Sequence, residues 1–221
     1  MQLQSWQAPG GSEELAIEFG PANAPRLLVL PAWFDESNKL RYFTIEVMRA
    51  LERSGVASVL PDLPGCNESL APMAEQDIKG WHAAAACAAE QLRCTHVLAI
   101  RAGANIAPAL PGFAYAPLAG KSALRAMLRA RAISAKEAGR EEKSADLLEL
   151  GKSEGLDLAG YRLGAGMIAQ LATAELHANP SLAEIKQDDL GGSGLWLRME
   201  PDHDQQQAEA LAARVAARMA T

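Results

Sequence analysis

Three short apolar runs separated by amphipathic segments limit the folds available to this chain. The runs cover residues 26–31, 56–61 and 95–101, and their apolar residues are consecutive instead of alternating. Consecutive apolar residues are typical of a strand that is buried on both faces. Between the runs, segments 40–51 and 72–92 have the composition and spacing of helices. This alternation predicts an α/β fold with a mostly parallel sheet and helices on both faces.

The parts of the chain on either side of this unit predict further elements. Residues 2–8 and 13–19 alternate apolar and polar around a Gly/Pro turn, which predicts an antiparallel hairpin at the amino terminus. The elements expected after residue 101 are a helix over 102–109, a strand over 112–117, an extended piece over 156–163, a helix over 165–178, a last strand over 194–200 and a terminal helix over 205–220.

Residues 121–154 differ from the rest of the chain in how their charges are distributed. The segment opens with basic residues and closes with acidic ones, and its leucines and Ile133 are spaced as in helices. We predict that 121–154 forms a helical cap inserted over the edge of the sheet. The whole chain, residues 1–221, is then one domain with this insertion.

Composition excludes several classes of function. The net charge is −6, and the basic residues do not gather in an aromatic-rich module, so no nucleic-acid partner is expected. Residues 1–11 lack the features of a secretory signal, and no apolar run is long enough to span a membrane, so we expect a cytoplasmic protein. Three cysteines without a C-x-x-C spacing predict reduced thiols. The four histidines share no metal-ligand spacing, and we expect no metal or other cofactor.

The third strand runs directly into a tight turn at residues 97–105. A strand followed by such a turn projects one side chain at the carboxyl edge of the sheet, which is where the motif G-x-S-x-G places a nucleophilic serine. Here the five residues are Ala99-Ile100-Arg101-Ala102-Gly103. A guanidinium stays protonated and cannot attack a carbonyl carbon. The turn therefore predicts a hydrolase-like frame without the usual hydrolase nucleophile.

Several motifs in this order resemble the α/β-hydrolase superfamily. Asp62-x-x-Gly65-x-x-x-Ser69 is similar to that superfamily's loop after the second parallel strand, and the turn at Arg101 follows as its elbow does. More narrowly, the chain resembles the second type of exosortase A-associated hydrolase, a bacterial group linked to exopolysaccharide and protein-sorting systems that also tends to carry arginine at the elbow. The matching pieces are Glu36-x-Asn38-Lys39-x-Arg41, the run 61–69, Arg101-x-Gly103-Ala104, Pro117-Leu118-x-x-Gly120 and Ala159-Gly160-Tyr161.

The resemblance implies a place for each member of a catalytic triad. In this superfamily the order along the chain is serine, then acid, then histidine. Asp202, after the expected strand 194–200, is the best match to the acid. The late histidine is missing, so His203 would have to act from a different loop, and Cys66 is a further weak candidate for a relocated nucleophile. We therefore expect no complete Ser-His-Asp triad.

A second group of polar residues is expected at the same sheet edge. The loop after the first strand carries Glu36, Asn38 and Lys39, and it should lie beside Arg101 because ligands of open α/β sheets bind outside the strand carboxyl ends. Asp35 or Glu36 could neutralise Arg101 in a local ion pair. Alternatively, Arg101 and these three residues bind a small anionic or sugar-like ligand. The two arrangements can coexist.

Three functions follow from these observations. The first is a degenerate hydrolase-like protein of an exosortase-associated or exopolysaccharide-associated system, which binds a ligand or partner without serine-type turnover. The second is an active, esterase-like hydrolase with a rearranged site that uses Asp62, Asp202 or His203. The third is a homo-oligomeric scaffold, in which helices form a homodimer face.

Overall fold

A seven-stranded sheet forms the centre of the computed structural model, which describes residues 1–21, 24–176 and 179–219. Its strand order is β1-β2-β4-β3-β5-β6-β9. Strands β1 and β2 form an antiparallel hairpin, β2 pairs antiparallel with β4, and the remaining strands are parallel. The strands are β1 Gln2–Gln7, β2 Glu13–Phe19, β3 Arg26–Leu30, β4 Ala57–Pro61, β5 His96–Ile100, β6 Gly112–Tyr115 and β9 Leu182–Ile185. The expected α/β class, with a mostly parallel sheet and an opening hairpin, is confirmed.

The central strands are buried on both faces, as their continuous apolar sequences predicted. In β3, Leu28 and Leu30 contribute to the core on one side of the sheet, whereas Leu27 and Val29 contribute to the core on the other side. All four side chains are fully buried. Successive side chains of a strand point to opposite faces, so a strand in the middle of this sheet needs apolar residues at every position.

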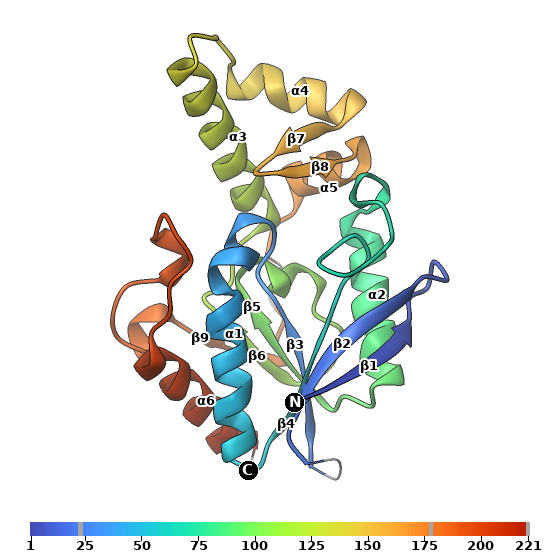
Figure 1. Ribbon diagram of the computed structural model, residues 1–221, viewed down its shortest axis with the longest axis vertical. Coiled ribbons are helices and arrows are strands. Elements are labelled where there is room, and N and C mark those ends of the chain that lie inside the picture. Colours follow the sequence, from blue (N-terminus) through green and yellow to red (C-terminus); the bar gives the residue numbers. More distant parts are fainter. Residues whose placement is uncertain (22–23, 177–178, 220–221) are drawn as a thin grey trace.

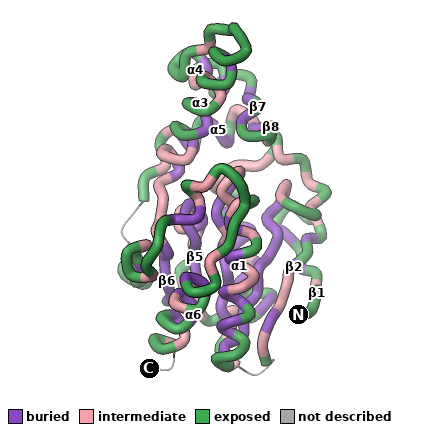
Figure 2. Tube along the Cα trace, turned by 60° about the vertical axis from the view of Figure 1, so that its left-hand side comes forward, coloured by how far each residue is buried: buried purple, intermediate pink, exposed green. Residues whose placement is uncertain are grey.

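Helices cover both faces of the sheet (Figure 1). The helices α1 and α6 pack together over one face and α2 lies on the other, so the purple, buried positions of Figure 2 gather between the layers. Helix α2 begins at Ile78, several residues later than predicted, because the Asp77 carboxylate accepts a hydrogen bond from the Gly80 backbone N–H at 2.7 Å and caps the helix there. The bounds are α1 Asp35–Arg53, α2 Ile78–Gln91 and α6 Gln205–Met219, with a 3₁₀ helix η1 at Met73–Glu75.

The chain between β6 and β9 forms a separate group of elements at one end of the sheet (Figure 1). Residues 121–154, predicted as a helical cap, contain two helices joined by a short turn. A small antiparallel hairpin and a further helix then lead back to the sheet. These elements are α3 Gly120–Glu137, α4 Ser144–Glu154, β7 Leu156–Leu158, β8 Tyr161–Leu163 and α5 Ala165–Thr173. The last residues of the helix predicted over 165–178 include two that lie outside the described part of the chain.

Two predicted elements are wrong. The α-helix expected over 102–109 is a six-residue 3₁₀ helix, η2 Arg101–Ile106, which ends just before Pro108. The strand expected over 194–200 contains instead the 3₁₀ helix η4 Leu195–Leu197. The last strand of the sheet is β9, a short edge strand that follows the group above and precedes the 3₁₀ helix η3 Gln187–Asp189.

Candidate functional site

The turn after β5 has the geometry of an elbow. Arg101 has a φ of 54°, in the left-handed region that side-chain-bearing residues seldom adopt. Two residues later, a Cβ on Gly103 would lie 2.6 Å from the Pro31 carbonyl oxygen and 2.7 Å from that of Leu30. Only a glycine lets η2 approach the end of β3 so closely. The sharp turn and the glycine together project residue 101 at the carboxyl edge of the sheet.

The Arg101 side chain is buried and its guanidinium is occupied by protein groups. Its Nε and Nη2 donate to the two carboxylate oxygens of Glu36, each at 3.0 Å, in a bidentate pair. Its Nη1 donates to the Ala116 carbonyl oxygen at 2.8 Å. The Trp196 ring lies 3.9 Å from the guanidinium carbon, in a cation–π contact. The local ion pair expected between Arg101 and the 35–39 loop is therefore present, with Glu36 as the partner.

Helix α1 brings Glu36 to this position through its first turn. The preceding residue, Phe34, has a φ of 56°, and this bend redirects the chain from β3 into the helix. Carboxylates in the first turn are favoured by the partial positive charge at the amino end of a helix. The other predicted loop residues have separate partners: Lys39 pairs with Asp35 at 3.3 Å, and the Asn38 amide donates to the Tyr161 hydroxyl at 3.2 Å.

Tyr161 connects the β7–β8 hairpin to this loop. Its hydroxyl donates to the Phe34 carbonyl oxygen at 3.2 Å and accepts from Asn38, and its ring packs edge-on against the Phe34 ring. Tyr161 belongs to the Ala159-Gly160-Tyr161 motif noted in the sequence, but its contact with the 34–38 loop joins residues more than 120 positions apart. No local sequence signal predicts that contact.

A cavity of about 430 Å³, which we call the elbow cleft, lies above Arg101 between α1, α3 and η4. Glu36 and Arg101 line part of it, and Asp35, Lys39 and Ser122 add further polar groups. Most of its lining is apolar. The larger apolar side chains of the lining are Trp33, Phe34, Leu118, Met127, Trp196 and Leu197. The elbow cleft is thus a largely apolar recess with an ion pair beside it and a few polar groups, a composition typical of small-molecule sites.

Trp196 is the site residue that sequence reasoning missed. It lies on the β9–α6 connection, residues 186–204, and packs between the Arg101 guanidinium and the Tyr115 ring, whose centroid is 6.0 Å away. The Tyr115 hydroxyl donates to the Gln187 side chain, and the Gln187 amide donates to the Gln207 side-chain oxygen at 3.1 Å. These two amides, of which the Gln207 amide is buried, hold the connection against the end of β6. Because 194–200 was predicted as a strand, nothing placed Trp196 over the elbow.

The weak catalytic candidates Asp202 and His203 do not lie at the elbow. Asp202 is on the exposed end of the β9–α6 connection and not after a sheet strand, because the sheet ends at β9. The backbone N–H of His203 and the Arg198 side chain lower the pKa of its carboxyl. The His203 ring packs on Tyr42 of α1, with centroids 4.7 Å apart. Neither residue lines the elbow cleft.

Cys66 and Asp62 lie in the loop after β4. Asp62 accepts a hydrogen bond from the Asn67 amide at 2.6 Å, and burial raises the pKa of its carboxyl, while Asn67 and Arg41 act in the opposite direction. Burial and the nearby Asp62 and Glu14 carboxylates raise the pKa of the Cys66 thiol to about 12. A thiol protonated at neutral pH is a poor nucleophile. Cys66 therefore lacks the activation that a relocated nucleophile needs.

We expect Cys66 and Cys94 to react slowly with alkylating reagents in the folded protein. Burial raises the pKa of both thiols to about 12 from 9.0. At about pH 8 the thiolate fraction is then about a thousand-fold lower than in the unfolded chain. Iodoacetamide labelling followed by peptide mass spectrometry, with and without urea, measures the two rates. Equally fast labelling of Cys66 in both states would contradict the assigned environment.

The described residues hold neither a cluster of metal ligands nor a membrane-spanning helix. Within the described part of the chain, no three His, Cys, Asp or Glu side chains are grouped so that they could hold a metal ion. No helix in residues 1–21, 24–176 and 179–219 combines the length and apolar character needed to cross a bilayer.

Parts of the chain are similar to several solved structures. The chain is similar to the proline iminopeptidase-related protein of Thermus thermophilus, with a TM-score of 0.47 and 22% identity over 70% of this chain and 57% of that chain. It is also similar to an epoxide hydrolase from Vigna radiata, with a TM-score of 0.44 and 19% identity over 52% of this chain and 39% of that chain. The matched regions thus span less than two thirds of either of those structures, and at these identities the likeness concerns the fold alone. No protein-family model and no curated protein sequence matches the chain.

Proposed function

We propose that this protein has no serine-type hydrolase turnover, and that its elbow cleft binds a small, largely apolar molecule with a polar end. The observation that carries the proposal is the engagement of Arg101 by Glu36 at the elbow. We also propose that the protein acts in a bacterial exosortase-associated or exopolysaccharide-associated system. The motifs Glu36-x-Asn38-Lys39-x-Arg41 and Arg101-x-Gly103-Ala104 support this association.

The contacts of Arg101 support a structural role for its charge. A ligand anion would have to displace Glu36 to reach the guanidinium edge, which would leave that carboxylate without its partner in a poorly solvated site. The Glu36–Arg101 pair then serves as a neutral part of the cleft wall. Lys39, Asp35 and the Ser122 hydroxyl line the same cleft and can form hydrogen bonds with the polar end of a ligand, whether anionic or sugar-like. Of the four predicted ligand-binding residues, this assigns direct contact to Lys39 and a positioning role to Glu36, Arg101 and Asn38.

The lack of serine-type turnover is tested with a fluorophosphonate probe and short p-nitrophenyl esters. We expect no covalent adduct and no ester hydrolysis above the rate of the heat-unfolded protein. Hydrolysis that disappears in a Cys66→Ala, Asp62→Asn or His203→Ala variant would instead support the alternative of an active hydrolase with a rearranged site. Cys66 and Asp62 lie near each other in the loop after β4, whereas His203 packs on Tyr42, so a site that uses all three requires His203 to move.

We expect the elbow cleft to bind dansylundecanoic acid, a fluorescent probe with an apolar chain and a carboxylate. An Ala126→Trp variant should weaken its binding at least about ten-fold, because the indole would fill the recess that Ala126 lines. Probe fluorescence in a titration measures the dissociation constant. Ala83→Trp, which adds the same ring at an exposed position of α2, is the matched control and should bind the probe as the unmodified protein does. Equal binding by both variants, or no saturable binding, would contradict the proposed site.

A further inference from the structure

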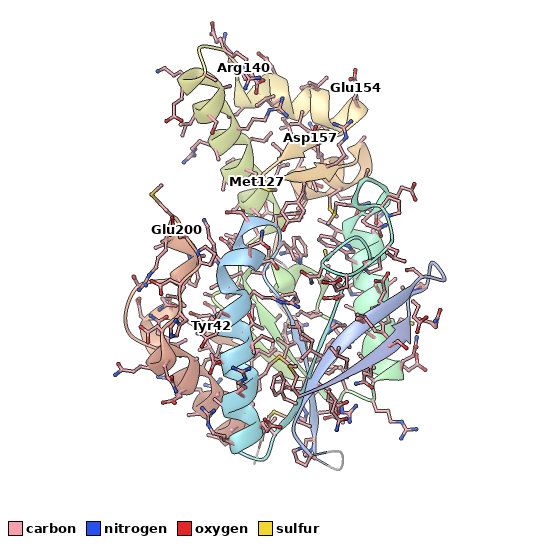
Figure 3. The ribbon with its side chains drawn as sticks, in the orientation of Figure 1. Tyr42, Met127, Arg140, Glu154, Asp157 and Glu200 are labelled. Carbon is pink, nitrogen blue, oxygen red and sulfur yellow. The ribbon has the colours of Figure 1, made fainter. Side chains whose placement is uncertain are left out.

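Two of the most exposed apolar side chains of the described chain lie together beside the mouth of the elbow cleft. Leu197 is 75% exposed and Met199 is 96% exposed, and both belong to the β9–α6 connection. Figure 3 shows this connection protruding near Glu200, below the part of α3 that carries Met127. Leu197 also lines the elbow cleft. Large apolar side chains that lie close together on a surface mark contact with a partner, unlike exposed apolar residues scattered singly.

Helix α3 and the turn that follows it carry a local excess of positive charge, part of which is neutralised because Lys121 pairs with Glu175 and Arg131 pairs with Glu142. Residues 120–140 contain six Lys or Arg and one Glu, a net charge of +5, in a chain of net charge −6. The rest of the chain therefore carries 15 basic and 26 acidic residues, a net charge of −11. The side chains of Arg125, Arg129 and Lys136 are exposed, and none makes a hydrogen bond or ion pair with another residue that the structure describes. Ile133, on the same helix, is 53% exposed.

These two features border the same opening. Helix α3 provides one wall of the elbow cleft through Ser122, Ala126 and Ala130, and the β9–α6 connection provides another through Trp196 and Leu197. In Figure 1 helix α3 lies above the amino end of α1, and the β9–α6 connection lies to the left of α1. The surface formed by Arg125, Arg129, Ile133, Lys136, Leu197 and Met199 thus combines apolar tips with exposed cations beside the elbow cleft, and we call it the mouth surface. Arg129, Ile133 and Lys136 line a second hollow, next to the turn between α3 and α4.

We propose that the mouth surface docks on an anionic lipid bilayer. Leu197 and Met199 insert among the lipid chains at the interface, while Arg125, Arg129 and Lys136 contact the acidic headgroups. The charge distribution favours this orientation, because an anionic surface attracts the +5 segment and repels the remainder of the chain. A second protein is a poorer fit. A stable protein interface needs a broad, complementary apolar centre, whereas here the apolar groups stand on a protrusion and the space beside them is hollow.

Vesicle sedimentation tests this proposal on the full chain. In about 0.1 M salt we expect binding to phosphatidylcholine vesicles that contain about 30 mol % phosphatidylglycerol, and little binding to pure phosphatidylcholine. Binding should fall steeply as the salt concentration rises, because the Debye length shortens. The absence of binding to the anionic vesicles would overturn the proposal.

Paired variants separate this surface from the general charge and hydrophobicity of the chain. Leu197→Ser/Met199→Ser and Arg125→Glu/Arg129→Glu should each lower the partition coefficient at least about ten-fold. The controls make the same kinds of change elsewhere: Leu3→Ser/Leu70→Ser at exposed leucines and Lys79→Glu/Arg93→Glu at exposed cations of the α2 side. Both controls should bind as the unmodified protein does, and an equal loss in them would overturn the proposal.

Two further results distinguish the remaining possibilities. Ala126→Trp fills the elbow cleft but leaves the mouth surface intact, so it should lose dansylundecanoic acid and keep vesicle binding. Failure of the ligand site therefore leaves the docking surface testable on its own. The protein could instead fail to bind vesicles and form a dimer in light scattering, with the dimer lost in Leu197→Ser/Met199→Ser. That result would assign the mouth surface to a second copy of the chain and overturn the membrane proposal.

Discussion

A Glu36→Gln variant is expected to lose about 3 kcal/mol of unfolding free energy, because it leaves the buried Arg101 guanidinium without a counter-charge. Both side chains of the pair are largely shielded from water, with exposed fractions of 10% for Arg101 and 18% for Glu36. The substitution keeps the size of the side chain and one hydrogen-bond acceptor, so the loss reports mainly the missing charge. Urea-induced unfolding followed by circular dichroism measures the effect.

Glu46→Gln is the matched control for this prediction. Glu46 lies on the same helix, is 14% exposed and forms an ion pair with Arg49 at 2.6 Å, but the Arg49 side chain is 45% exposed and therefore remains hydrated when Glu46 is replaced. Such a pair contributes at most about 1 kcal/mol. If the two variants lost equal stability, the Glu36–Arg101 pair would not be a structural element of the elbow. An Arg101→Met/Glu36→Leu double variant should recover part of the loss, since neither charge is then left alone.

A Gly103→Ala variant is expected to lose at least about 3 kcal/mol of unfolding free energy, or to fail to fold. The new methyl group would meet the Leu30 and Pro31 carbonyl oxygens at 2.7 and 2.6 Å, and both are backbone atoms that cannot move aside cheaply. Thermal and urea unfolding measure the loss, and expression as insoluble protein is the more severe form of the same result.

Gly166→Ala provides the comparison at a glycine that has open space. Gly166 lies in α5, and a Cβ there meets no atom within 4 Å. Alanine in a helix interior should increase stability by up to about 1 kcal/mol. A Gly103→Ala variant as stable as Gly166→Ala would mean that η2 does not approach β3 as closely as this structure has it.

The sequence predicts the sheet well where burial makes its pattern strong. Strands β3, β4 and β5 are buried on both faces, so their continuous apolar runs leave no competing interpretation. The last strand was misplaced for the opposite reason. In β9, Ala183 and Glu184 are exposed, and its four residues give no apolar run, whereas Leu195-Trp196-Leu197 does. That run does not pair in the sheet, and its Trp196 packs on Arg101 and Tyr115.

The candidate site was predicted in part. The elbow and an ion pair of Arg101 with Asp35 or Glu36 follow from local patterns, because a strand, a turn and a loop at one sheet edge must lie close together. The structure selects Glu36. Trp196, the Ala116 carbonyl and Tyr161 come from segments that reach the elbow only through the tertiary fold. The expected match of Asp202 to the catalytic acid depended on the misplaced strand, and Asp202 instead lies on the exposed end of the β9–α6 connection.

The brevity of η2 has a consequence for charge at residue 101. A full α-helix concentrates about half a positive elementary charge at its amino end, which favours an anion there and disfavours a cation. Arg101 is the first residue of a 3₁₀ helix of only six residues, whose aligned peptide dipoles sum to much less. The short helix thus disfavours a permanent cation at its first residue less than a long helix would, because its amino end carries less partial positive charge. For the same reason, placing serine at residue 101 would supply a hydroxyl without the helical field that stabilises a developing oxyanion.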